Sequence, residues 1–457
     1  MTYIGLLGGV ALLIWLALRG VNIVFSALLC SLLVVVTNGL PVAESMTEYF
    51  SFGPLGAFTF AGKFFLLFCA GAIFGRVMGE SHAAASIALA LVRRFGAHRS
   101  LIITTVACAL LTYGGVVVFV VIFAMYPLGL KLLQEADIPK RLFCAALALG
   151  GGTFTLTALP GTPSTVNVIA AVALGTDLFA GGWLGVLGSV IMLGGGLWYL
   201  EWQRVLAHER GEHFVPGPND RIVEVHDDDY PAWPLALLPL VSVLLTILLP
   251  RVAIMAVAPE DLAAGDGVFA LLRFANSQLV VWPSIALLIG SLIAVALFRP
   301  VRPSALRVLG EGTQDAVVPL INTAAVIGFG GVVTHTVGFE QFVGLMLDSG
   351  LPPLVSSFVS VSLVSGITGS TTGGLQIFMQ TMAPSYLEAG LQPEVLHRLS
   401  TMAAGGFDSL PHCGAVVAML TITGLTHKEA YRDVGIITVV IPVIAAVVAC
   451  IVAALFY

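Results

Sequence analysis

The sequence predicts an all-α polytopic membrane protein made of two copies of one helical bundle, and three observations support this fold class. Of the 457 residues, 58% are hydrophobic and only 10% are charged, whereas soluble domains carry about 25% charged residues. Apolar runs of about 20 residues, the length that crosses a bilayer, recur along the whole chain. Stretches rich in glycine and proline interrupt two of these runs in each half, which is typical of the broken helices of transporters.

The first half, residues 1–200, contains a complete set of expected elements. Its first run has no basic residue before it, so we expect a retained span rather than a cleaved signal. The expected elements are spans at Ile4–Leu18, Val21–Val36 and Leu55–Phe74, an interfacial helix at Ser81–Val92, a run at Ser100–Leu130 interrupted at Tyr113-Gly114-Gly115, a run at Arg141–Leu174 interrupted from Gly150 to Ser164, and a span at Trp183–Leu200.

Residues 201–230 are polar and are expected to form a cytoplasmic linker between the halves. They contain His208, Glu212 and His213, which form either a metal cluster or, as is common in loops, a solvated charged segment. The second half, residues 231–457, repeats the order of the first. Its expected elements are spans at Pro234–Leu249, Val280–Phe298 and Val317–Val333, a short interfacial helix at Phe339–Leu347, a run at Pro353–Met382 interrupted at residues 368–374, a run at Pro393–Leu425 interrupted at residues 405–414, and a span at Gly435–Phe456.

The two halves align with a nearly constant offset, which places Gly115 on Gly369 and Pro139 on Pro393. With the N-terminus outside and the two glycine-interrupted runs as re-entrant hairpins, the positive-inside rule is satisfied. Of the 20 Lys and Arg residues, 16 then lie inside. Arg251, Arg273 and Arg398 lie outside, and Lys63 lies within a span. Each half crosses the membrane an odd number of times, so the sequence predicts an inverted repeat of about ten spans with two hairpins and two discontinuous helices.

The four interruptions are predicted to meet near the bilayer midplane and to form a substrate site. Broken helices expose N-terminal N–H groups that bind anions without Lys or Arg. Hydroxyl and amide side chains at the breaks would complete the site, although any single hydroxyl can instead bond to a helix carbonyl. The candidate substrate-binding residues are Tyr113, Gly114, Gly115, Thr157, Pro160, Gly161, Thr162, Ser164, Asn167, Gly369, Ser370, Thr371, Thr372, Gly373, Asp408, Ser409 and His412, with Thr155 and Thr368 as further hydroxyls.

Asp408 and His412 are the ionisable side chains at these breaks apart from the Tyr113 phenol, and both are candidates for proton coupling. Two alternatives remain: Asp408 only caps the helix that restarts near Pro411, or His412 donates a hydrogen bond to substrate without titrating. Lys63 either snorkels, pairs with an acid, or contacts the moving part of the protein, and Asp315 and Asn322, in or just before the corresponding second-half span, are its possible counterparts.

Other function classes have little support in the sequence. The six cysteines lack metal-ligand spacing and are expected to be buried thiols. No nucleophile elbow, phosphate loop or metal-ligand set is found, so we expect no enzyme, cofactor or metal, and no nucleic-acid partner. A sodium/proton exchanger and a channel remain alternatives to a carrier of an organic anion.

The interruption motifs resemble those of the gluconate permease (GntP) family in the ion transporter superfamily. The resemblance lies in residues 157–164, in Asp408-Ser409-Leu410-Pro411-His412-Cys413-Gly414 with the following 424–429 segment, and in the hairpin tip at residues 369–374. It implies a homodimer in the inner cell membrane, with a scaffold domain and a transport domain that moves as an elevator through the lipid. We take Ile4–Val36 and Pro234–Phe298 as scaffold.

The resemblance also implies proton-coupled uptake of a small organic anion such as gluconate or 3-hydroxybutyrate, with sodium as the second choice of coupling ion. In sugar-acid permeases of this family we expect a histidine in the first-half motif. This chain has only Thr157 and Thr162 there, so a smaller hydroxy-monocarboxylate is at least as well supported as gluconate.

Overall fold

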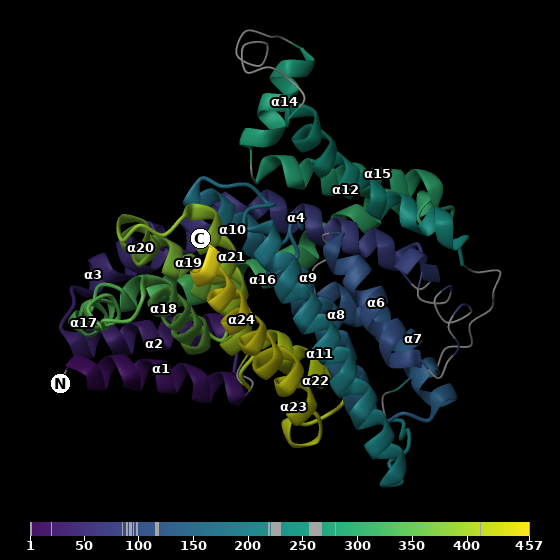
Figure 1. Ribbon diagram of the computed structural model, residues 1–457, viewed down its shortest axis with the longest axis horizontal. Helices are drawn as coiled ribbons and strands as arrows, with labels where there is room; N and C mark the ends of the chain where they lie inside the picture. The colour runs from purple at the N-terminus through teal and green to yellow at the C-terminus, as the bar shows by residue number, and fades with distance from the viewer. Residues whose placement is uncertain are drawn as a thin grey trace.

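The computed structural model describes residues 2–19, 21–84, 86–87, 90, 94, 96, 99–114, 118–217, 220, 230–255, 267–278, 280–411 and 413–456. Every regular element in these residues is a helix, so the all-α class is confirmed for the described part of the chain. The helices form two groups, each of which packs mainly on itself. Figure 1 shows their arrangement.

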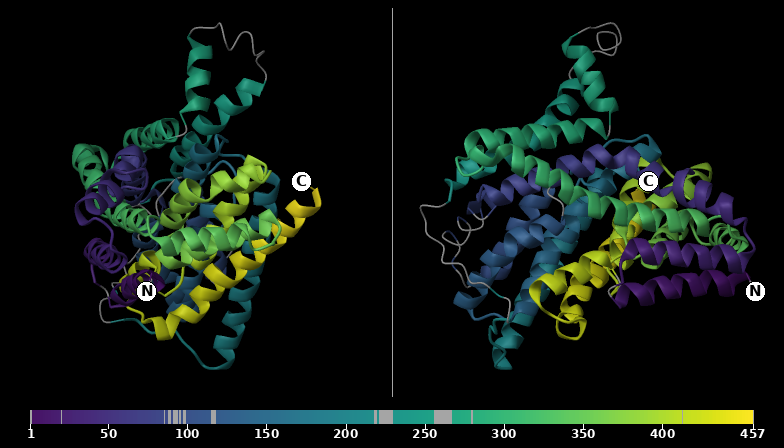
Figure 2. Two further views of the ribbon diagram at one scale, coloured as in Figure 1. Left: turned by 90° about the vertical axis from the view of Figure 1, so that its left-hand side faces the viewer. Right: turned by 180° about the vertical axis from the view of Figure 1, so that it is seen from behind.

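Helix group A is built around a long antiparallel pair, α4 (Ala57–Glu80) and α16 (Ala305–Val333). The pair packs closely because it carries glycine at the contact: a Cβ on Gly312 would lie 2.8 Å from the Ile73 Cα. The other members are α1 (Thr2–Leu18), α2 (Ile23–Asn38), the short α3 (Val42–Glu44) with a π-helical segment (Ser45–Phe52), α12 (Trp233–Met255), α14 (Val268–Ser277) and α15 (Val281–Leu297). Figures 1 and 2 show α14 at the end of an arm that α12 and α15 form.

Helix group B contains the broken helices of both halves. From the first half come α6 (Ser100–Tyr113), α7 (Val118–Ala136), α8 (Lys140–Gly152), α9 (Phe154–Thr157), α10 (Thr165–Leu174) and α11 (Gly182–Glu209). From the second half come α18 (Pro353–Thr368), α19 (Thr371–Thr381), α20 (Ala383–Glu388), α21 (Pro393–Phe407), α22 (Gly414–Thr423), α23 (His427–Gly435), a π-helical turn (Ile436–Val440) and α24 (Ile441–Phe456). α8 and α21 are buried over most of their length, as expected for helices that other helices surround. α24 runs beside α11 (Figure 1).

The expected interruptions are confirmed where the chain is described. The first-half run breaks between α8 and α10, with only the four-residue α9 inside the gap, and the second-half run breaks between α21 and α22. α18 and α19 turn back on each other at Gly369 and Ser370, as a hairpin does. Insertion of the two copies in opposite senses stays a prediction, as do the domain boundaries.

Several elements differ from the expectation, among them α11, α14 and α17 (Val337–Leu347). α11 continues to Glu209, nine residues beyond the expected end, because the charged residues after Leu200 are good helix formers. α14 is an additional helix in the second half. α17 begins two residues before the expected Phe339, because Thr336 caps it there. The expected interfacial helix at Ser81–Val92 lies partly outside the described residues.

Five helical segments in the described residues are long and apolar enough to cross a membrane by length and composition: Val42–Glu80, Gly182–Glu209, Trp233–Ile254, Arg302–Val333 and His427–Phe456. A sixth is added if α14 and α15, which meet at 107°, form one bent span. Shorter apolar helices include Ile23–Asn38, Ser100–Tyr113 and Pro353–Thr368. These findings fit a membrane protein with several spans, and the count of about ten stays a prediction.

Candidate functional site

A cavity of about 1400 Å³ lies between the α4–α16 pair of group A and the broken helices of group B. At one end it reaches the interruptions, where Ser164, Ser370 and Asp408 line it. At the other end it reaches Arg76 and Glu80 in the last turns of α4. The cavity is therefore the space in which the predicted site residues would meet a solute.

Three helices of group B begin at this cavity. α10 starts after Ser164, whose hydroxyl accepts a hydrogen bond from the backbone N–H of Asn167 at 3.3 Å. α19 starts after Ser370, whose hydroxyl accepts one from the backbone N–H of Gly373 at 3.1 Å. α22 starts at Gly414, after Cys413. The first N–H groups of a helix lack intrahelical partners and carry partial positive charge. This wall of the cavity is therefore electropositive without a basic side chain.

The hairpin tip shows how the chain makes such an N-terminus. α18 ends at Gly369 with φ +59°, a left-handed conformation that favours glycine, and Ser370 is extended, so the chain stops one helix and starts the next within two residues. The two arms then pack at close range, because a Cβ on Gly374 would lie 2.3 Å from the Ser365 Cα. The sequence Thr368-Gly369-Ser370-Thr371 therefore fixes the direction of the α19 N-terminus.

Asp408 joins the two interruptions of the second half. It is only 5% exposed and follows α21 as its C-cap residue. One carboxylate oxygen accepts a hydrogen bond from the Thr371 hydroxyl of the hairpin tip, and the other accepts from the Ser409 hydroxyl at 3.0 Å. No ion pair between Asp408 and a Lys or Arg is present among the described residues, so its negative charge is balanced only by hydroxyl groups and helix ends.

The cationic side chain nearest the site is already engaged. Arg76 is the only Lys or Arg in the described cavity lining, and it pairs with Asp315 at 2.9 Å and with Glu311. Asp315 is thus the partner of Arg76 rather than of Lys63, which corrects one alternative for Lys63. The Lys63 side chain is exposed, with Nζ 5.9 Å from the centre of the Phe64 ring.

The predicted site residues divide into three sets. Those that line the cavity are Ser164, Gly369, Ser370, Thr371, Thr372, Asp408 and Ser409. Those described elsewhere in group B are Tyr113, Gly114, Thr157, Pro160, Gly161, Thr162, Asn167 and Gly373. Gly115 and His412 lie outside the described residues, so the predicted role of His412 is not addressed by the geometry.

Asn167, one of the first-half residues outside the lining, belongs to a buried polar network. The side-chain amide nitrogen of Asn167 donates to the Thr162 and Leu178 carbonyls, each at 2.9 Å. The side-chain oxygen of Asn167 lies 2.8 Å from His397 Nε2. His397 Nδ1 in turn lies 2.7 Å from the Thr176 hydroxyl. The hydrogen-bonding capacity of Asn167 is used inside the protein, so we do not include it in the proposed binding site.

Other polar residues line the cavity although they were not among the predicted site residues. They include Thr112, Thr165, Gln314, Asn322 and Thr323. Thr165 follows directly after the helix-start signal at Ser164, which could have identified it. Asn322 and Thr323 lie in the apolar α16, and an adjacent polar pair inside a predicted span is itself a signal of function.

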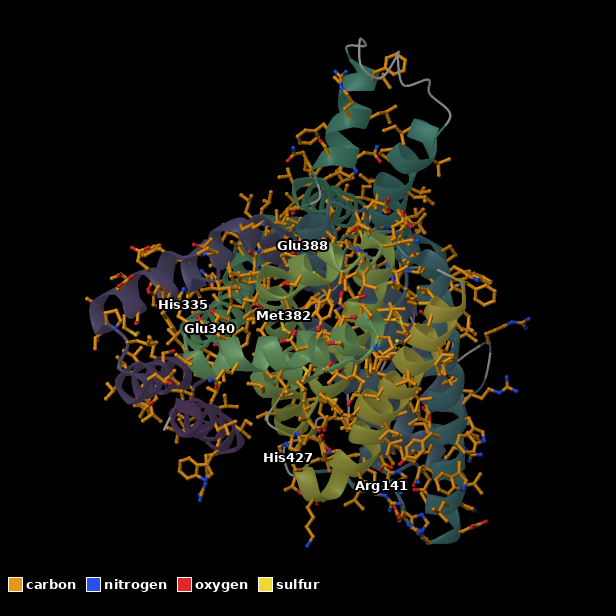
Figure 3. The ribbon with its side chains drawn as sticks, turned by 60° about the vertical axis from the view of Figure 1, so that its left-hand side comes forward. Arg141, His335, Glu340, Met382, Glu388 and His427 are labelled. Atoms are coloured by element: carbon orange, nitrogen blue, oxygen red, sulfur yellow. The ribbon has the colours of Figure 1, made fainter. Side chains whose placement is uncertain are left out.

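The linker binds group B at the end of the molecule that carries Arg141 and His427, far from Glu388 (Figure 3). Arg141 pairs with Glu212 of the linker at 2.8 Å and with Asp433 of α23. His213 lies 2.6 Å from Asp137. No group of three or more potential metal ligands is found among the described residues. Glu212 thus holds the linker to Arg141 at the start of α8, and His213 holds it to Asp137, which directly follows α7.

Asp220 makes a buried contact between the linker and group B, with its side chain 5% exposed. It accepts from Lys140 Nζ at 2.8 Å, from the Tyr126 hydroxyl at 2.6 Å and from the Gly217 amide at 2.6 Å. Burial alone would raise the pKa of Asp220, but these three donors together hold that pKa below its ordinary value of 3.8. Asp220 is therefore held as a carboxylate at neutral pH.

Comparison with known proteins gives a consistent result. The sequence model of the GntP family permeases matches residues 1–456 of this chain. The chain is 37% identical over 463 residues to a Bacillus subtilis (strain 168) protein described as the uncharacterized transporter YxjC, covering 96% of each chain. It is 25% identical over 350 residues to an uncharacterized transporter of Haemophilus influenzae (strain ATCC 51907 / DSM 11121 / KW20 / Rd), covering 76% of this chain and 74% of that protein.

One solved structure has a similar fold. The YdaH transporter of Alcanivorax borkumensis, described as having an unusual topology, superposes with a TM-score of 0.52 over 87% of this chain and 88% of that one. The two sequences are 15% identical, so the likeness concerns the fold alone.

Proposed function

The chain belongs to the GntP family of permeases, and we propose that it is a proton-coupled symporter of a small hydroxylated monocarboxylate. One observation supports this proposal above the others: three helix N-termini share a cavity with the buried carboxyl group of Asp408, which pairs with no Lys or Arg in the described part of the chain. The helix ends attract an anion, and Asp408 is a buried carboxyl group whose protonation changes the net charge of the site.

The substrate carboxylate would bind to the N-termini of α10, α19 and α22. Helix N-termini bind carboxylates and phosphates through N–H groups and the helix dipole, so no arginine is required. The cavity of about 1400 Å³ is far larger than such a molecule, and the polar groups at the interruptions would fix its position. A monocarboxylate places its single charge at these helix ends and leaves its uncharged part facing α4 and α16.

Proton coupling follows from the position of Asp408 in this cavity. An ionised Asp408 beside a bound carboxylate puts two like charges in a poorly hydrated site, which is unfavourable. Protonation of Asp408 removes that repulsion, so substrate and proton bind together, one anion with one proton. His412 remains a second candidate for this proton, because it follows Asp408 by four residues in the sequence and histidine titrates near neutral pH.

The division into two helix groups supports an elevator mechanism. The cavity lies along the boundary between the groups, with the broken helices all on the side of group B. We propose that group A is the scaffold and that group B carries the substrate across the membrane. The inverted repeat, the homodimer and the location in the inner membrane are part of the same proposal and rest on the family.

Uptake by purified protein in liposomes tests the function. We expect saturable accumulation of radiolabelled 3-hydroxybutyrate or gluconate when the outside is made more acidic than the inside. Asp408→Asn should abolish this accumulation. Asp348→Asn is a matched control, because Asp348 also follows a helix as its C-cap residue but is exposed and does not line the cavity.

Other outcomes would support the alternatives. Accumulation driven only by a sodium gradient would make the protein a sodium-coupled carboxylate transporter. Sodium or proton exchange without any carboxylate effect would identify a sodium/proton antiporter. Flux that never saturates would identify a channel, and full proton-coupled uptake by the Asp408→Asn variant would remove Asp408 from the mechanism.

A further inference from the structure

We propose that Asn322 and Thr323 of the scaffold helix α16 recognise the hydroxyl group of the substrate and so set the preference for hydroxylated over plain carboxylates. This inference rests on the proposed function, because it concerns the same cavity. It assigns the two ends of the substrate to different helix groups: the carboxylate to group B and the hydroxyl group to group A.

One face of α16 forms a wall of the cavity along several turns. Gln314, Val318, Asn322 and Val326 recur every four residues along this face, and all of them line the cavity. Thr323 lines it as well. Asn322 and Thr323 therefore present polar groups to the cavity in the middle of an apolar helix.

Neither side chain has a recorded protein hydrogen bond within the described part of the chain. Two other threonines behave differently: the hydroxyl of Thr313 in α16 bonds to the Leu309 carbonyl at 2.9 Å, and the hydroxyl of Thr334, the C-cap residue of α16, bonds to the Gly331 carbonyl at 2.8 Å. Asn322 and Thr323 are half-buried. Polar groups in such a position need a partner, which water or a solute in the cavity would supply.

The pair is close to the proposed carboxylate site. Val326, one turn beyond Asn322, contacts the hairpin tip, because a Cβ on Gly373 would lie 3.3 Å from Val326 Cγ1. One helical turn is about 5.4 Å. A small hydroxy acid held at the α19 N-terminus can therefore extend its hydroxyl group toward Asn322 and Thr323.

Four of the hydroxyl groups of group B that line the cavity are already engaged in other contacts. Thr371 and Ser409 donate to Asp408, Ser164 donates to the Leu156 carbonyl at 2.8 Å, and Thr112 donates to carbonyls of its own helix and of α8. Asn322 and Thr323 together can both donate and accept, which matches a hydroxyl group. The neutral pair thus provides recognition of a hydroxyl without adding charge to the site.

Binding measurements with 3-hydroxybutyrate and butyrate test this assignment, because the two probes differ only in the hydroxyl group. The variants are Asn322→Leu and Thr323→Val, which keep side-chain volume and remove hydrogen-bonding groups. Val318→Ala is the control, since it changes an apolar residue on the same face of α16. Isothermal titration of the purified full-length protein gives the dissociation constants.

We expect each variant to weaken 3-hydroxybutyrate binding by roughly 3- to 10-fold and to leave butyrate binding unchanged. The Val318→Ala protein should keep the wild-type preference. An unchanged preference in both variants, or an equal loss for both probes, would overturn the assignment while leaving carboxylate transport intact. If the wild-type protein binds neither these probes nor gluconate, the proposed function itself fails.

Discussion

The hydroxyl of Thr371 donates a hydrogen bond to the carboxylate of Asp408 and thereby joins the tip of the α18–α19 hairpin to the break between α21 and α22. These residues are separated by 37 positions in the chain. The contact makes the proposed anion-binding N-terminus of α19 and the proposed proton carrier one structural unit. Under this proposal, binding at one of them affects the hydrogen bonding of the other.

Replacing Thr371 by valine should impair transport without unfolding the protein. Valine keeps the shape of the side chain but removes the hydroxyl group, and a hydrogen bond to a charged group is worth about 1.5–3 kcal/mol. We expect the apparent affinity for substrate to fall roughly 10- to 100-fold. Proton-driven uptake in liposomes measures the effect.

Two variants control for this experiment. Thr371→Ser should retain most activity because it keeps the donor. Thr381→Val lies at the other end of α19, where the hydroxyl bonds to the Ile377 carbonyl of its own helix at 2.7 Å, and should transport normally. Equal activity of Thr371→Val and the wild-type protein would show that the contact with Asp408 has no part in transport.

Replacing Gly374 by alanine should disrupt the hairpin. The added Cβ would lie 2.3 Å from the Cα and Oγ of Ser365, and backbone of a neighbouring helix cannot move aside cheaply. We expect a loss of about 1–3 kcal/mol in stability, together with loss of uptake because the α19 N-terminus is displaced. Thermal unfolding in detergent and uptake in liposomes measure the two effects.

Gly344 provides the matched control for this change. It lies within the helix α17, and a Cβ built on it meets nothing within 4 Å. Alanine there should be neutral or slightly stabilising because of its better helix propensity. If Gly374→Ala is as stable and as active as Gly344→Ala, close packing of the hairpin arms is not required.

The positions of the helix breaks could be predicted from sequence because their cause is local. Gly369 adopts φ +59° and Ser370 caps the following helix, and both properties belong to the residue types themselves. The concentration of hydroxyl residues at the breaks likewise indicated a polar site. What these signals cannot supply is the direction in which each side chain points.

The side-chain pairings could not be predicted because they are long-range. Asn167 looked like a substrate ligand, yet its partner His397 lies 230 residues away and uses its oxygen. Asp315 looked like a counterpart of Lys63, yet it pairs with Arg76 across 239 residues. Asn322 and Thr323 were missed as site residues since their exposure to the cavity depends on how α16 packs against group B.

Arg398 should be required for folding rather than for substrate binding. Its side chain is fully buried in α21 and donates to the Ala180 carbonyl at 2.8 and 3.0 Å and to the Leu178 carbonyl at 3.3 Å, which holds the loop between α10 and α11. Lysine cannot reproduce this planar donor geometry. We expect Arg398→Lys to lower the stability by about 1–3 kcal/mol, because buried carbonyls lose their donors.

Thermal unfolding in detergent measures this effect, with Arg432→Lys as the control on the exposed face of α23. Substrate affinity of the Arg398→Lys protein that remains folded should equal that of the wild type, since Arg398 does not line the cavity. A large loss of affinity at unchanged stability would contradict the structural role.

The stability that the Asp220–Lys140 contact of the linker contributes should fall as the pH is lowered into the acidic range. The folded-state pKa of Asp220 lies below its ordinary value of 3.8, so folding favours the carboxylate form. The stabilisation is fully present above the ordinary value and is lost as the pH falls through the lower folded-state pKa. At neutral pH, Asp220→Asn should therefore be destabilising by roughly 3–5 kcal/mol, because it leaves Lys140 buried without its counter-charge.

Unfolding measured for the wild type and Asp220→Asn over a range of acidic pH tests this prediction. The stability difference between the two proteins should be constant from neutral pH down to about pH 5 and should shrink below the ordinary aspartate range. Asp348→Asn, at an exposed aspartate without a recorded ion pair among the described residues, should show no such difference. A difference that grows on acidification would mean that Asp220 binds its partners in the protonated form, contrary to the three donors around its carboxylate.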